Sequence, residues 1–131
     1  METALNKPYL ASWLIIPILV LIGLVFNQHT IDIQLHDTYF VISNIHFVLS
    51  ASLLLLLVGL GYWFIKRLGK SPNRVLTTVH LLLTVGVVML FAVPIAENSM
   101  GLSALFVWSV VTLLVAQVLY LINIFLSLLR K

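Results

Sequence analysis

Two histidines, His46 and His80, lie inside long apolar stretches of the sequence, where an ionisable side chain is uncommon. Neutral imidazole is the commonest side-chain ligand for metals and binds haem iron, so both residues are candidate ligands. No motif surrounds His80, and we expect it to be a buried hydrogen-bonding residue. His46 follows Asp37 by nine residues, which on a continuous helix places it about 13 Å below the outer surface.

The composition around these histidines is that of an integral membrane protein. The 131-residue chain is 62% hydrophobic and only 8% charged, with a mean hydropathy of +1.17. A soluble domain of this length could hardly cover so much apolar surface with so few polar side chains. The same numbers exclude a disordered chain and a basic nucleic-acid binder. The absence of cysteine excludes a disulfide scaffold and covalent c-type haem attachment.

Four apolar stretches are each long enough to form a helix that crosses the hydrocarbon core of a bilayer. They cover residues 10–26, 41–65, 75–93 and 102–129, and three polar segments separate them. No linker or internal repeat divides the chain. We therefore predict one all-α domain over residues 1–131, an integral membrane four-helix bundle that contacts the lipid bilayer.

The charged residues predict how this bundle is oriented. All seven basic residues fall on one side of the membrane, whereas Asp32, Asp37 and Glu97 fall on the other; the basic residues are Lys7, Lys66, Arg67, Lys70, Arg74, Arg130 and Lys131. Basic residues accumulate in cytoplasmic loops, so we expect both termini on the cytoplasmic side, in a bacterial plasma membrane. Aromatic residues near the predicted inner ends, Tyr62 among them, are expected to be interfacial anchors.

The segment that enters the second predicted helix carries a specific pattern. Residues 35–50 read LHDTYFVISNIHFVLS. This strongly resembles the stretch that leads into the tenth helix of subunit I of the haem–copper oxidases, the cytochrome c and quinol oxidases. In that family Leu-His-Asp-Thr-Tyr is followed by a few apolar residues and then by His-x-His-aromatic-Val. The resemblance extends more weakly over residues 32–64, and the other three predicted helices show no convincing match.

The resemblance implies roles for individual residues. His46 matches the axial ligand of the low-spin haem. His36 and Asp37 match the pair near the haem propionates and the non-redox magnesium site, and Tyr39 is expected to help organise the propionates. Asn44 stands where the family has the histidine that binds the high-spin haem. The chain also lacks a cluster of three histidines for the active-site copper, so we assign no catalytic residue and predict no oxygen reduction by this chain alone.

Two kinds of function remain open. The first is a haem-binding protein for electron transfer or sensing, in which His46 holds a b- or a-type haem non-covalently. No partner ligand is evident in the chain, so the second axial ligand would come from another copy in a homodimer or homotrimer. The second is a non-catalytic structural subunit of a respiratory membrane complex without a cofactor of its own. An amide in hydrocarbon needs a partner, so we expect Gln117 and Asn123 to face protein, either within the bundle or across a subunit boundary. In a structural subunit they would face another chain.

Overall fold

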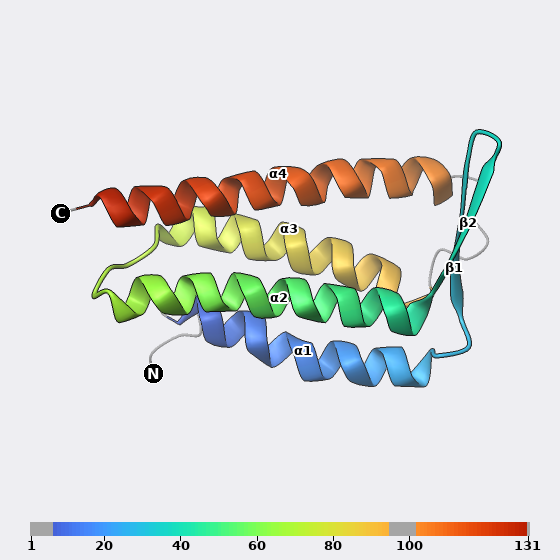
Figure 1. Cartoon of the computed structure of the whole chain (residues 1–131), viewed down its shortest axis with the longest axis horizontal. Helices are drawn as coiled ribbons and strands as arrows, with labels where there is room; N and C mark the ends of the chain where they lie inside the picture. Colours follow the sequence, from blue (N-terminus) through green and yellow to red (C-terminus); the bar gives the residue numbers. More distant parts are fainter. Residues whose placement is uncertain (1–6, 95–101, 131) are drawn as a thin grey trace.

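In the computed structural model, which describes residues 7–94 and 102–130, four long helices lie side by side (Figure 1). They are α1 (Pro8–Val25), α2 (Asn44–Arg67), α3 (Arg74–Ala92) and α4 (Leu102–Leu129). In the part of the chain that is described, all four are long and apolar enough to cross a membrane. The prediction of four long apolar helices is thereby confirmed, and their ends lie within three residues of the predicted boundaries.

A β-hairpin joins α1 to α2, so the prediction of an all-α fold is wrong for this segment. The strands β1 (Thr30–Leu35) and β2 (Thr38–Ser43) pair antiparallel along their whole length. In β1 the side chains of Ile31 and Ile33 are buried while the polar residues between them are exposed. This alternation is typical of a strand with one covered face. Because Phe40, Val41 and Ile42 of β2 are apolar, the sequence predicts a second helix that begins at residue 41, whereas α2 begins at Asn44.

The hairpin lies across one end of the bundle. Ile31 and Ile33 pack against Phe91 near the end of α3, and Phe106 of α4 borders the same cluster. β1 therefore runs past the ends of α3 and α4, and the hairpin tip projects beyond α4 (Figure 1). A short sheet of two strands is rarely stable alone, so this apolar contact with the helices is what holds it.

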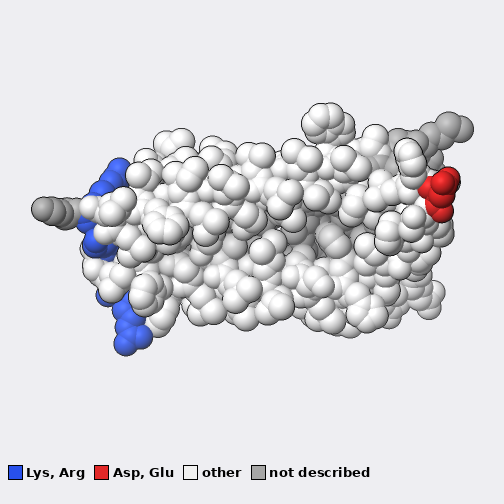
Figure 2. Space-filling model, turned by 45° about the horizontal axis from the view of Figure 1, so that its top comes forward, with Lys and Arg blue, Asp and Glu red and all other residues white. Residues whose placement is uncertain are grey.

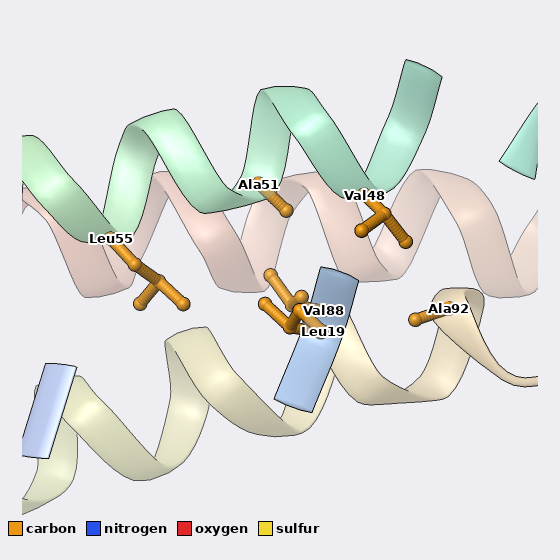
Figure 3. Packing of buried hydrophobic residues seen from close by; sticks show 6 residues of the cluster. All are labelled: Leu19, Val48, Ala51, Leu55, Val88 and Ala92. Atoms are coloured by element: carbon orange, nitrogen blue, oxygen red, sulfur yellow. The ribbon is translucent and has the colours of Figure 1, made fainter. Parts of the chain in front are cut away.

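The core of the bundle lies where α1, α2 and α3 meet. Its fully packed residues come from all three helices, as Figure 3 shows: Leu19, Val48, Ala51, Leu55, Val88 and Ala92. Their side chains point toward one another from the three helices, and this shared cluster fixes which face of α2 is turned inward. The rest of α2 is left for other contacts.

The outward faces of the helices are apolar as well. In the most apolar stretch of α4 only 11% of the residues are buried within the chain. Large side chains such as Trp108 and Phe125 are more than half exposed on this helix. A surface of this kind is stable only when lipid or another protein covers it.

Charged side chains gather at the two ends of the molecule (Figure 2). The basic end carries the start of α1, the loop between α2 and α3, and the end of α4, and Asp32 and Asp37 lie on the hairpin at the opposite end. Two charged residues used in predicting the orientation, Glu97 and Lys131, lie outside the described residues. This separation agrees with the predicted arrangement of the helices, while the cytoplasmic location of the basic end stays a prediction.

Candidate functional site

His46 and Asn44 lie in the first turn of α2 and face opposite sides of the helix. The Asn44 side chain is 2% exposed, whereas His46 is exposed. Residues two apart on a helix differ in direction by about 200°, so only one of them can face the bundle. The inward position is fixed by Val48, one turn after Asn44, which is part of the core.

Asn44 joins three helix ends inside the bundle. Its Nδ2 donates to the carbonyl oxygen of Phe26 at 3.3 Å and to that of Ala92 at 3.1 Å. Phe26 caps the end of α1, and Ala92 is the last residue of α3. Carbonyls at helix ends lack partners within their own helix, so the amide satisfies two of them. The Asn44 side chain therefore has a structural role.

His46 shares the outward face of α2 with apolar side chains. Leu49 and Leu53, one and two turns further along the helix, are 52% and 58% exposed. The imidazole makes no hydrogen bond to another described residue, while the backbone carbonyl of His46 accepts one from Ser50 Oγ at 2.9 Å. An accessible imidazole beside an apolar surface fits one side of a haem site, since it offers an iron ligand and a surface for the porphyrin.

The predicted depth of His46 assumes a helix that continues from Asp37, and this premise is wrong because residues 38–43 form β2 and α2 begins at Asn44. His46 therefore lies about 3 Å along the helix axis from the start of α2. It is close to the hairpin end of the bundle.

His36 and Asp37 form the two-residue loop at the tip of the hairpin, and both are exposed. The backbone of His36 has a φ of 55°, a left-handed conformation that is uncommon in residues other than glycine. An extended strand rises about 3.3 Å per residue, so β2 separates the tip from the start of α2 by about 20 Å. Within one chain, the structure does not bring His36 and Asp37 together with His46.

Tyr39 lies on β2 and is bound across the hairpin. Its hydroxyl donates to Asp32 Oδ2 at 2.8 Å. This hydrogen bond to the Asp32 carboxylate raises the pKa of the Tyr39 phenol above its usual value. Among residues 7–94 and 102–130, no group of three or more His, Cys, Asp or Glu side chains could hold a metal ion.

A second group of polar side chains lies inside the bundle, toward its basic end. His80 on α3 is fully buried, and its Nδ1 shares a hydrogen bond of 3.0 Å with the Tyr62 hydroxyl on α2. The ring of Tyr120 on α4 lies 5.1 Å from that of His80 between ring centroids. The expectation that His80 is a buried hydrogen-bonding residue is confirmed. Tyr62, expected to be an interfacial anchor, is completely buried.

The amides of α4 also find their partners within the chain. Asn123 accepts a hydrogen bond from the backbone N–H of Asn73 at 2.8 Å and donates to Thr77 Oγ1 at 2.8 Å. Gln117 donates to Thr84 Oγ1 at 3.3 Å. These bonds join α4 to α3, so the first alternative for Gln117 and Asn123, a partner within the same bundle, is confirmed.

Comparison with known proteins shows that about half of the chain is similar to cytochrome c oxidase subunit 1. The identity to the Candida albicans subunit is 40% over 73 residues, which cover 54% of this chain and 14% of that protein. The Synechocystis subunit is 38% identical over 65 residues, which cover 49% and 12%. The Albinaria turrita subunit is 40% identical over 45 residues, which cover 34% and 23%.

The similarity is thus partial on both sides. Each of these matches covers less than a quarter of the relative's length. No family model matches the chain. No solved structure matches it either. The chain is a partial relative of subunit 1, in agreement with the resemblance of residues 35–50.

Proposed function

From this partial relationship to cytochrome c oxidase subunit 1, we propose that the chain is a membrane-inserted protein that binds a low-spin haem through His46. The haem is of b or a type, is held non-covalently, and serves electron transfer or redox sensing in a bacterial plasma membrane. The basic end of the bundle faces the cytoplasm. The observation that carries the proposal is the exposed His46 imidazole, without a hydrogen bond to any described residue, on an apolar helix face.

The haem lies between copies of the chain. A low-spin haem takes two axial ligands, and His46 supplies one. His80, the other histidine on a described helix, is fully buried and bound to Tyr62. The second ligand therefore comes from a neighbouring copy. In a symmetric dimer it is the same His46, because the two subunits of such a dimer contact each other through identical surfaces.

The residues around His46 prepare this face for the cofactor. Leu49 and Leu53 supply apolar surface that excludes water from the ligand. The hydrogen bond from Ser50 to the His46 carbonyl adds to the connections within the first turns of α2. A bound haem supplies one-electron transfer, whereas the chain supplies the ligand, its orientation and the surrounding apolar surface.

His36 and Asp37 lie near the haem only when they belong to a neighbouring copy of the chain. They lie about 20 Å from the start of α2 in their own chain, and the hairpin tip projects beyond α4 (Figure 1). In a cyclic trimer the tip of one copy meets the His46 face of the next, and His36, Asp37 and Tyr39 then lie near the haem propionates. In the dimer the tip has no such role. The dimer shares one haem between two chains, whereas the trimer has one such interface for each chain, so the ratio of haem to chain distinguishes the two assemblies.

Oxygen reduction by the chain alone is not part of the proposal. In the family, the residue that corresponds to Asn44 holds the high-spin haem. Here an amide occupies this position and donates to the Phe26 and Ala92 carbonyls. At this position the inward face of α2 therefore bonds to the ends of α1 and α3.

The test is a reduced-minus-oxidised optical spectrum of the detergent-purified protein, expressed with added haem. We expect the sharp bands of a six-coordinate haem, and we expect His46→Ala to abolish them. His29→Gln is the matched control, because it removes a histidine from the segment between α1 and β1, which has no part in either proposed assembly. A colourless wild-type protein that co-purifies with other subunits would favour the second function, a structural subunit of a respiratory complex.

A further inference from the structure

A cavity of about 380 Å³ opens at the basic end of the bundle, between the loop that follows α2 and the last turn of α4. Its lining residues are Leu68, Gly69, Lys70, Ser71, Ser127 and Arg130. This volume is within the range of about 300–1,000 Å³ that is usual for sites that hold small molecules. The segments that line it, after α2 and at the end of α4, lie at the end of the molecule opposite to the hairpin (Figure 1).

The way α2 ends brings Lys70 to this cavity. Gly69 has a φ of +72°, a conformation that glycine adopts without strain. Its N–H donates to the Lys66 carbonyl at 3.0 Å, and the N–H of Lys70 donates to the Ile65 carbonyl at 3.2 Å. These two bonds are those of a Schellman motif, which closes a helix and turns the chain back. Lys70 Nζ then donates to the Leu128 carbonyl in the last turn of α4.

The cavity has a positive charge that no described acidic residue balances. Lys70 and Arg130 both line it. The acidic residues in the described part of the chain, Asp32 and Asp37, lie on the hairpin at the other end (Figure 2). Ser71 adds a hydroxyl that can donate to an anion. Two cations and a hydroxyl around one cavity are the groups that bind a phosphate ester.

Apolar side chains are exposed in the cavity lining and beside it. Leu68 is 49% exposed, and Leu129, which precedes Arg130, is 76% exposed. The cavity thus combines side chains of the basic end (Figure 2) with the exposed apolar side chain of Leu68. A ligand that fits both parts has a negatively charged head and an apolar tail.

We infer that this cavity binds the headgroup of an anionic phospholipid. The phosphate lies between Lys70 and Arg130, and the acyl chains extend along the apolar surface beside Leu68 and Leu129. The inference rests on the membrane insertion proposed above and is independent of the haem. It assigns the binding of anionic lipid to Lys70 and Arg130 in one cavity, in addition to the general attraction that a basic end has for anionic lipids.

The test is native mass spectrometry of the delipidated protein in mild detergent, titrated with dioleoyl phosphatidylglycerol or dioleoyl phosphatidylcholine. We expect tighter binding of the anionic lipid. Lys70→Gln combined with Arg130→Gln should weaken it about 30-fold, at about 1 kcal/mol for each lost contact to the phosphate. Arg74→Gln is the matched control, because it removes one charge from the same end outside the cavity. Its affinity should stay within about twofold of the wild type.

Three results would overturn the inference. The first is equal binding of the two lipids, and the second is an equal loss of affinity in the Arg74→Gln control. The third is inorganic phosphate binding as tightly as the lipid, which would show a site for free phosphate. Arg130→Gln alone decides the question if the double variant loses helicity by circular dichroism. A protein that needs no detergent would contradict membrane insertion itself, and this outcome is distinct from a detergent-soluble protein without lipid preference.

Discussion

The Tyr62 hydroxyl lies 3.0 Å from Nδ1 of His80, and this hydrogen bond joins α2 to α3 inside the bundle. Both residues are fully buried, and Nε2 of His80 has no hydrogen-bond partner among the described residues. The Tyr62 hydroxyl is therefore the hydrogen-bond partner of the His80 imidazole among the described residues. A buried polar group that loses its partner is costly, whereas removing both partners is nearly neutral.

We expect Tyr62→Phe to destabilise the protein by about 1–3 kcal/mol, because it leaves His80 without this hydrogen bond. The measurement is the midpoint of unfolding by dodecyl sulfate in mixed micelles. The double variant Tyr62→Phe with His80→Leu should recover part of the loss, which gives a coupling energy between the two sites. Additive effects would mean that the two side chains contribute independently.

Asn44 offers a sharper test of a single side chain. Asn44→Asp keeps the shape but replaces the amide that donates to the Phe26 and Ala92 carbonyls with a group that has no N–H. We expect it to destabilise the protein more than Asn44→Ala does, because a buried carboxylate then faces two carbonyl oxygens. Unfolding midpoints of the two variants are compared at neutral pH. If Asn44→Asp were the more stable of the two, the amide would not join the helix ends.

The sequence predicts the four helices but not the hairpin, and the residues of each explain the difference. The long apolar stretches allow little except a helix that crosses a membrane. In the hairpin, Ile31 and Ile33 alternate with polar residues that resemble a loop, while β2 continues the apolar character of α2. The turn between the strands contains His36 and Asp37 and lacks the glycine that usually marks a two-residue hairpin loop.

For the candidate site, the sequence could predict that Asn44 and His46 face opposite sides of their helix, but not which of them faces the core. The role of His46 as an iron ligand stays a prediction. Which of the two faces the core depends on Val48 and Leu55 packing against α1 and α3, a tertiary contact. Leu55, Val58 and Tyr62 are three and four residues apart and lie on the same buried face of α2. This spacing could have identified Tyr62 as a core residue.

The packing of α1 on α2 requires a glycine at position 59. A Cβ atom there would lie 2.1 Å from Trp13 Nε1, which donates to the Leu56 carbonyl at 3.4 Å. We expect Gly59→Ala to destabilise the protein by about 1–3 kcal/mol, since the indole must move. Gly86→Ala is the control, because nothing lies within 4 Å of its added Cβ. It should leave stability unchanged or raise it by up to about 1 kcal/mol through helix propensity.

Both glycine variants are measured by thermal unfolding, with tryptophan fluorescence as a report on the indole environment. Gly59→Ala should change the emission spectrum and Gly86→Ala should not. Equal stability of the two variants would contradict the close approach of Trp13 to α2.

The hydrogen bond between Tyr39 and Asp32 predicts a pH dependence of the hairpin. The bond raises the pKa of the Tyr39 phenol above its usual value of 10.0. A raised pKa means that the folded chain holds the proton more tightly than the unfolded chain. The stabilisation by this bond is therefore complete below the ordinary phenol pKa and is lost as the pH rises through the raised value.

Asp32→Asn tests this directly, because it removes the negative charge while keeping a side-chain oxygen. We expect the pKa of Tyr39 to fall toward that of an ordinary tyrosine. The measurement is a spectrophotometric titration of tyrosinate absorbance, with Tyr39→Phe used to assign the signal by subtraction. Asp37→Asn is the matched control, since Asp37 carries the same charge at the hairpin tip and does not accept the Tyr39 hydrogen bond. An unchanged Tyr39 titration in Asp32→Asn, or an equal fall in Asp37→Asn, would show that the bond does not set this pKa.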